Sequence, residues 1–196
     1  MMMQRESLGN WCYENSIKQS KEIDWNSFGD ELWSIANIFR SDIVKPTEYL
    51  EEFSYLFFLR LFDEQEIYRE MIAKELGKEY KPTIPNEYRF FNWACDPRSY
   101  ARSKGFETVI DFLDKMFLDL ANLPDSGDPK IDEDRRIIRK IFSNKTRRMQ
   151  NDNTVIQVID RLRILKLPED EGRKFDALGR GYEFLMYKLG QQGNYG

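Results

Sequence analysis

The spacing of apolar residues along the first third of the chain predicts helices rather than strands. Between residues 28 and 43 they recur every three or four positions, which places them on one face of a helix. These are Phe28, Leu32, Ile35, Ala36, Phe39 and Ile43. A second helix is predicted from Pro46 to about Leu76, because proline lacks the N–H that would have no partner in a first helical turn.

The segment YLFFLRLF, residues 55–62, is apolar almost all round. A helix with this composition packs on several sides, so we expect it at the centre of the fold. Arg60 within it then needs a partner, and Asp42, Asp63 and Glu64 are candidates. Alternatively, Arg60 lies at the edge of the core and extends its charge to water.

Residues 77–105 interrupt the helical pattern, since they hold three prolines and no sustained period. We expect this middle segment to be irregular, and we consider a short strand or strand pair around residues 88–93 as an alternative. Amphipathic helices are predicted again over residues 106–120, 133–142, 153–165 and 176–189. The fold expected is all-α, a bundle of about five to seven helices, with residues 1–24 as an N-terminal arm and 25–189 as the helical domain.

Composition supports a folded domain and excludes several kinds of active site. The 196 residues are 41% hydrophobic and include 14 Phe, 10 Tyr and 4 Trp, which is enough for a sizeable core. Histidine is absent, which excludes Ser-His-Asp and Cys-His catalysis and histidine-containing zinc sites within this chain. Carboxylates, Lys, Tyr, Ser and Thr remain for chemistry, and we identify no catalytic or metal-ligating residue among them.

No run of 18 apolar residues occurs, and the start of the chain lacks the apolar stretch of a signal peptide. We therefore expect a cytoplasmic protein without a membrane partner. Cys12 and Cys95 lie in unrelated sequence contexts, and cytosolic proteins rarely form disulfides, so we expect two free thiols.

The net charge of the chain is only −4, but the sequence contains one strongly basic region. In RRIIRKIF, residues 135–142, the cations fall at i, i+1, i+4 and i+5, which predicts one outward stripe of a helix opposite an apolar face. Such a stripe suits a nucleic-acid backbone, where each neutralised phosphate adds salt-sensitive affinity; the alternative is a solvated charged face. The candidate DNA-binding residues are Arg135, Arg136, Arg139, Lys140, Lys145, Arg147 and Arg148.

Two short strings imitate known motifs without matching them. LGRGYEF, residues 178–184, lacks the third glycine of a dinucleotide fingerprint, because Phe184 stands there. ACDPRSY, residues 94–100, lacks the second proline of the loop with which amino-methyltransferases hold a flipped base. A polar loop that caps a helix explains ACDPRSY better.

Two blocks near the start resemble the opening of the modification (methyltransferase) subunits of type I restriction-modification systems. They are ELWSIANIFRSDI, residues 31–43, and EYLEEFSYLFFLRLFDEQE, residues 48–66. The residues that match the family pattern are Leu32, Trp33, Ala36, Asn37, Arg40, Glu48, Tyr49, Leu56, Phe57, Leu59, Arg60, Leu61 and Asp63. The closing blocks, residues 141–165 and 176–196, are similar to later helices of that family and to a glycine-rich link that follows them.

The resemblance implies an N-terminal helical domain that is not an enzyme by itself. In the family, the link continues into a doubly wound domain that binds S-adenosylmethionine and methylates adenine N6, so residues 190–196 would begin a linker to an absent catalytic domain. No cofactor is expected within residues 1–196. The implied partners are duplex DNA, the specificity subunit, a second modification subunit and the restriction subunit. A free-standing helical protein-interaction module is the alternative.

Overall fold

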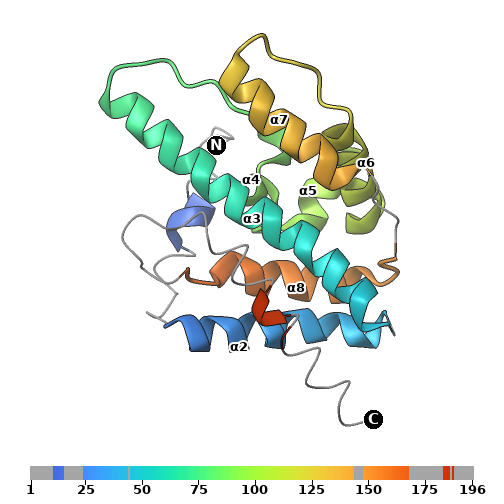
Figure 1. The fold of residues 1–196 in the computed structure, drawn as a ribbon. Helices are drawn as coiled ribbons and strands as arrows, with labels where there is room; N and C mark the ends of the chain where they lie inside the picture. The colour runs from blue at the N-terminus through green and yellow to red at the C-terminus, as the bar shows by residue number, and fades with distance from the viewer. Residues whose placement is uncertain are drawn as a thin grey trace.

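A computed structural model of the chain describes residues 11–15, 24–43, 45–143, 148–167, 183–185 and 187, and shows a bundle of helices (Figure 1). None of these residues lies in a strand, so the all-α prediction is confirmed. The helices are α2 (Trp25–Ala36), η1 (Asn37–Ser41), α3 (Pro46–Glu75), η2 (Asn86–Tyr88), α4 (Phe90–Trp93), α5 (Pro97–Ser103), α6 (Val109–Ala121), α7 (Pro129–Phe142) and α8 (Asp152–Ile164). No described helix is both long enough and apolar enough to cross a membrane.

Helix α2 begins where a side chain caps its first turn. The Asp24 carboxylate accepts hydrogen bonds from the backbone N–H groups of Asn26 and Ser27, both at 2.9 Å. This is a favourable N-cap, because it satisfies donors that have no partner inside the helix. The apolar face predicted from residue 28 is buried, but the last turn tightens into the 3-10 helix η1. Trp33, one of the residues matching the family pattern, is only partly buried against the core.

Helix α3 runs through the middle of the bundle for 30 residues, as its apolar composition predicts (Figure 1). Phe53 and Phe57 are buried and stack on each other, with ring centroids 5.6 Å apart. Arg60 is buried too, and it pairs with Glu64, one of the three predicted candidates. It also donates to the carbonyl oxygens of Leu162 (3.2 Å) and Leu165 (3.1 Å), so Arg60 ties the central helix to the end of α8.

The middle segment is helical where a strand was considered, so that expectation was wrong. Residues 88–93 form the end of η2 and the single turn α4, and only Arg89 between them is extended. Tyr88, Phe90, Phe91 and Trp93 are all buried, whereas a strand with one solvated face would bury every second residue. The ACDPRSY loop does cap a helix, since Asp96 accepts the Ser99 N–H at the start of α5.

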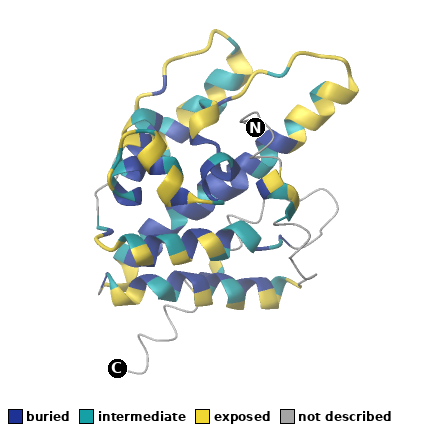
Figure 2. Ribbon diagram, turned by 180° about the vertical axis from the view of Figure 1, so that it is seen from behind, coloured by how far each residue is buried: buried dark blue, intermediate teal, exposed yellow. Residues whose placement is uncertain are grey.

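Helices α6, α7 and α8 complete the core, and buried positions line the inner side of each helix (Figure 2). Aromatic rings join them to α3. The ring of Phe142 on α7 stacks on that of Phe117 on α6, at 5.1 Å between centroids, and Tyr55 on α3 lies 5.6 Å from Phe142. These contacts position α7, the helix that carries the predicted basic stripe.

The expectation of two free thiols was wrong, because Cys12 and Cys95 form a disulfide across 83 residues of chain. Residues 11–15 form a short helix against the bundle, with Cys12 fully buried. The Tyr13 ring meets the Phe91 ring edge-on at 5.0 Å, and this packing brings the two cysteines together. Burial raises the pKa of Tyr13 to about 12. The sequence contexts of the cysteines are unrelated, but tertiary packing makes them neighbours.

The predicted helix over residues 176–189 is helical at the positions described, 183–185 and 187. Leu185 is buried there. The rest of that predicted helix, the proposed linker at residues 190–196 and most of the predicted arm lie outside the described residues.

Candidate nucleic-acid interface

Helix α7 begins at Pro129, and the residue before it, Asp128, caps the helix because its carboxylate accepts the Lys130 N–H at 3.0 Å. Its buried face is narrower than the sequence predicts. Ile138 and Phe142 are buried, but Ile137, which belongs to the apolar face predicted opposite the cations of RRIIRKIF, is 50% exposed. The helix therefore lies on the surface of the bundle, attached along one narrow stripe.

The sequence predicts that all four cations of RRIIRKIF point outward. In the structure, two of them do not. Arg135 donates to the carbonyl oxygens of Thr83 (2.8 Å) and Pro124 (2.7 Å). Arg139 donates to the carbonyl oxygen of Leu123 at 2.8 Å and pairs with Asp125 at 2.9 Å. Both guanidinium groups are consequently occupied in holding neighbouring loops to α7.

The loop that receives these arginines is itself fixed by α7. The Asp132 carboxylate accepts the N–H of Ser126 at 2.6 Å, the hydroxyl of Ser126 at 2.7 Å and the N–H of Gly127 at 3.2 Å. These hydrogen bonds hold the pKa of Asp132 below its usual value. Gly127 has φ +83°, a conformation that favours glycine, which allows the loop to turn back onto the helix.

Of the seven candidate residues, Arg136 and Lys140 present their charges to solvent. The Arg136 side chain is 72% exposed and lies 3.7 Å from the equally solvated Glu133. Lys140 is exposed. Arg148 pairs with Glu51 on α3, and its backbone N–H donates to Glu52 at 3.1 Å. Lys145 and Arg147 lie outside the described residues, so the described basic face is smaller than the sequence suggests.

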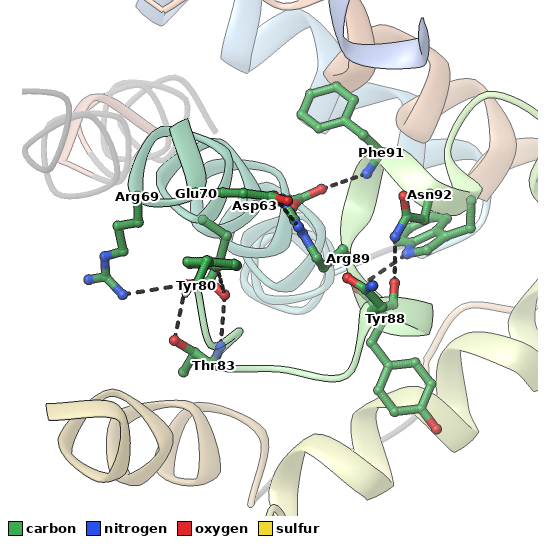
Figure 3. A network of polar contacts seen from close by, with 12 residues as sticks. Asp63, Arg69, Glu70, Tyr80, Thr83, Tyr88, Arg89, Phe91 and Asn92 are labelled. Atoms are coloured by element: carbon green, nitrogen blue, oxygen red, sulfur yellow. Dashed lines mark hydrogen bonds and ion pairs between the residues drawn. The ribbon is translucent and has the colours of Figure 1, made fainter. Parts of the chain in front are cut away.

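A buried carboxylate on α3 connects the middle segment to this face (Figure 3). Glu66 is 1% exposed and accepts hydrogen bonds from the Tyr80 hydroxyl (2.5 Å), the Thr83 N–H (2.8 Å) and the Thr83 hydroxyl (3.0 Å). Burial, followed by the neighbouring Glu66 charge, raises the pKa of Tyr80. The carbonyl of Thr83 then accepts from Arg135, which makes a continuous path from α3 through residue 83 to α7.

A second carboxylate of α3, Asp63, holds the other end of the middle segment. It accepts from the Arg89 guanidinium at 2.7 Å and from the Phe91 N–H at 2.8 Å (Figure 3). Burial raises the pKa of Asp63, and the adjacent Arg89 charge opposes that shift. Arg89 also pairs with the half-exposed Glu70 at 2.8 Å. The sequence placed Asp63 beside Arg60; its actual partner comes from the segment that showed no pattern.

These groups border an open pocket of about 850 Å³. Its lining includes Asp63, Glu70, Arg89, Trp93, Tyr100 and Lys104. Lys104 contacts Glu87 at 2.5 Å and Arg89 binds Asp63 and Glu70, while Asp96, also in the lining, accepts the Ser99 N–H. No group of three potential metal ligands occurs among the described residues. The ion pairs of Arg89 join α3 to the middle segment beside this pocket.

Comparison with known protein families gives a match over most of the described bundle. The family model described as HsdM N-terminal domain matches residues 28–162. That range begins in α2 and ends in α8, so it contains the middle segment and the basic helix. Neither a curated protein nor a solved structure matches the chain.

Proposed function

Since the chain belongs to the HsdM N-terminal domain family, it contains the N-terminal helical domain of a type I restriction-modification modification subunit, and we propose that this domain helps to enclose duplex DNA and contacts the specificity subunit. The observation that carries the proposal is the extent of the match. It covers α3, the buried carboxylates of α3 and the segment that they hold, which together form the framework of the bundle.

The surface of α7 supports a contact with DNA, but through two exposed cations rather than the seven that the sequence suggests. Arg136 and Lys140 are exposed on a helix that Arg135 and Arg139 fix to the adjoining loops. A rigid support of this kind keeps two cations at constant spacing, and cations at fixed spacing suit a phosphate backbone. Arg135 and Arg139 then contribute indirectly, by positioning the helix.

The C-terminal end of α3, which we call its far end, supports a contact with another subunit. Four exposed apolar residues lie where α3 extends past the rest of the bundle (Figure 2): Tyr68, Met71 and Ile72 on the helix, and Leu76 directly after it. A cluster of exposed large apolar residues is typical of a protein interface. We assign this cluster to the specificity subunit, the partner that the family resemblance implies.

Methyl transfer to adenine N6 belongs, in this proposal, to a catalytic domain of the same subunit that binds S-adenosylmethionine. The described residues do not fit that cofactor, because they contain no strand and therefore no strand-turn-helix unit that could present a glycine loop. A second modification subunit and the restriction subunit complete the proposed assembly.

Fluorescence anisotropy with a labelled DNA duplex tests the DNA-facing role. The folded 196-residue protein should bind at low salt, and its affinity should fall steeply between about 50 and 200 mM salt because phosphate contacts release counterions. Absence of binding at the lowest salt, with the circular dichroism spectrum of a helical protein, would contradict DNA enclosure by this domain. A free-standing interaction module would give that same negative result.

Co-purification tests the subunit contact separately. The protein should be retained by a tagged specificity subunit from the same restriction system, and Met71→Ser with Leu76→Ser should abolish retention without changing thermal stability. Exposed Leu118 on α6 provides the matched control, since Leu118→Ser removes an equally exposed apolar side chain elsewhere. Equal retention of all three proteins would refute the assignment of this surface.

A further inference from the structure

Three segments distant in sequence meet at one end of the bundle, away from the far end of α3. The Asp42 carboxylate, just after η1, accepts the N–H groups of Gln150 and Asn151 at 3.0 Å each. Asn153, in the first turn of α8, accepts a hydrogen bond from the guanidinium of Arg98 on α5. The end of η1, the start of α8 and α5 therefore form one continuous edge, and η1 and α8 lie together in Figure 1.

Three carboxylates along this edge, those of Asp42, Asp96 and Asp152, accept hydrogen bonds from backbone N–H groups. Asp42 binds the two N–H groups that precede α8. Asp96 accepts the Ser99 N–H at 3.1 Å, and Asp152 accepts those of Val109 and Ile110 at 3.0 Å each. These hydrogen bonds cap helices and join segments, and none of these three carboxylates forms an ion pair with a described arginine of the edge.

The cations of the edge, in contrast to its carboxylates, are directed toward solvent. Arg40, Arg98 and Arg102 are all exposed, and none of them forms an ion pair with a described carboxylate. Arg98 and Arg102 are four residues apart on α5, which puts them on one face of that helix. The amide side chains of Gln150, Asn151 and Asn153 are exposed between α5 and η1.

We propose that this arginine edge, Arg40, Arg98 and Arg102 with the neighbouring amides, is a contact surface for the phosphate backbone of duplex DNA. The inference rests on the proposed function, and it moves the main contact from α7 to the edge. Guanidinium groups bind phosphate in two-pronged geometry, and amide side chains commonly add hydrogen bonds to the same backbone. On α7 the two best-placed arginines are already bound to loop carbonyls, whereas Arg40, Arg98 and Arg102 are exposed, with Arg98 bound to the exposed amide of Asn153.

The test compares three variants in the same anisotropy titration, and the first two are matched in charge. The edge variant is Arg40→Ala, Arg98→Ala and Arg102→Ala. The control is Lys74→Ala, Lys78→Ala and Lys81→Ala, which removes three exposed cations at the far end of α3 and the loop after it. A third variant, Arg136→Ala with Lys140→Ala, removes the solvated cations of α7.

The edge variant should bind DNA at least about tenfold more weakly at 100 mM salt, and its plot of log affinity against log salt should flatten by about two to three units, close to one per lost phosphate contact. The control should keep most of the slope. Glu107→Gln should strengthen binding, because Glu107 is exposed in the turn before α6, beside the N–H groups that Asp152 binds. All the replaced side chains are exposed, so unchanged thermal melting verifies folding.

The outcomes separate this inference from the proposed function. If the wild-type protein binds DNA and the α7 variant loses affinity while the edge variant does not, the edge is refuted and DNA enclosure stands. Equal losses in the edge and lysine variants would mean that only net charge matters, which also refutes the edge. If the wild-type protein does not bind at all, the proposed function itself fails.

Discussion

Phe184 lies so close to Gly29 that a β-carbon at residue 29 would be 2.6 Å from the Phe184 ring. Gly29 is in the buried face of α2, and Phe184 belongs to the helical residues near the end of the chain. Glycine normally weakens a helix interior, by about 1 kcal/mol relative to alanine. Its presence here is explained by the space that the ring needs, so this contact attaches the last helical segment to α2.

We predict that Gly29→Ala destabilises the protein even though alanine favours helices. Overpacking of this kind costs about 1–3 kcal/mol, which outweighs the helix-propensity gain. In a Phe184→Ala background the clash disappears, so the same substitution should stabilise by up to about 1 kcal/mol. Urea denaturation of the four proteins measures the double-mutant cycle. A stabilising Gly29→Ala in the wild-type background would contradict the contact.

The two carboxylates that bind Arg89 offer a matched pair. The Asp63 side chain is 1% exposed, whereas that of Glu70 is 49% exposed. Asp63→Ala should cost about 3–5 kcal/mol, because it leaves a buried guanidinium without its main partner. Glu70→Ala should cost under about 1 kcal/mol, as expected for a solvated ion pair. Similar losses in the two variants, measured by chemical denaturation, would show that Asp63 does not hold the middle segment.

The disulfide gives a third prediction. Oxidised protein, denatured without reductant, should contain no thiol that reacts with a colorimetric reagent, and reduction should release two. Closing a loop with a sequence separation of 83 residues restricts the unfolded chain, so reduction should lower the free energy of unfolding by about 2–4 kcal/mol. The Cys12→Ala, Cys95→Ala protein should be insensitive to reductant. Two reactive thiols before reduction would refute the pairing.

How far the sequence predicts this structure depends on whether the information is local. The 3.6-residue period and Pro46 were sufficient to place α3, and Phe57 is buried as its position on that helix indicates. The strand considered at residues 88–93 failed because the conformation there is set by distant groups. Asp63 binds the Phe91 N–H and Arg89, and no local pattern contains that contact.

The candidate site shows the same limit. Helical spacing correctly put Arg136 and Lys140 at the surface. It could not reveal that Arg135 and Arg139 reach carbonyl groups of residues 83, 123 and 124, because those loops have no periodicity. Arg98 was considered only as part of the ACDPRSY string, and Arg102 lies just after it, although their i, i+4 spacing was a signal that could have been used. The Cys12–Cys95 pair had no signal at all apart from its being the only two cysteines.

The carboxylate that caps α2 predicts how the stability of the protein changes as the pH falls. Hydrogen bonds from the backbone N–H of Ser27 and also of Asn26 hold the pKa of Asp24 below its usual value. A carboxylate whose pKa is lower in the folded state stabilises the protein above its unfolded pKa, about 3.9, and this contribution disappears as pH falls through the folded value. Asparagine caps helices about as well but does not titrate. Asp24→Asn should therefore keep its melting temperature near neutral pH, yet lose less stability than the wild-type protein between about pH 5 and pH 2.

Glu75→Gln is the control, since exposed Glu75 accepts no hydrogen bond from a described residue, and it should retain the acid dependence of the wild-type protein. Identical acid profiles for Asp24→Asn and the wild-type protein would mean that the carboxylate does not cap α2 in solution.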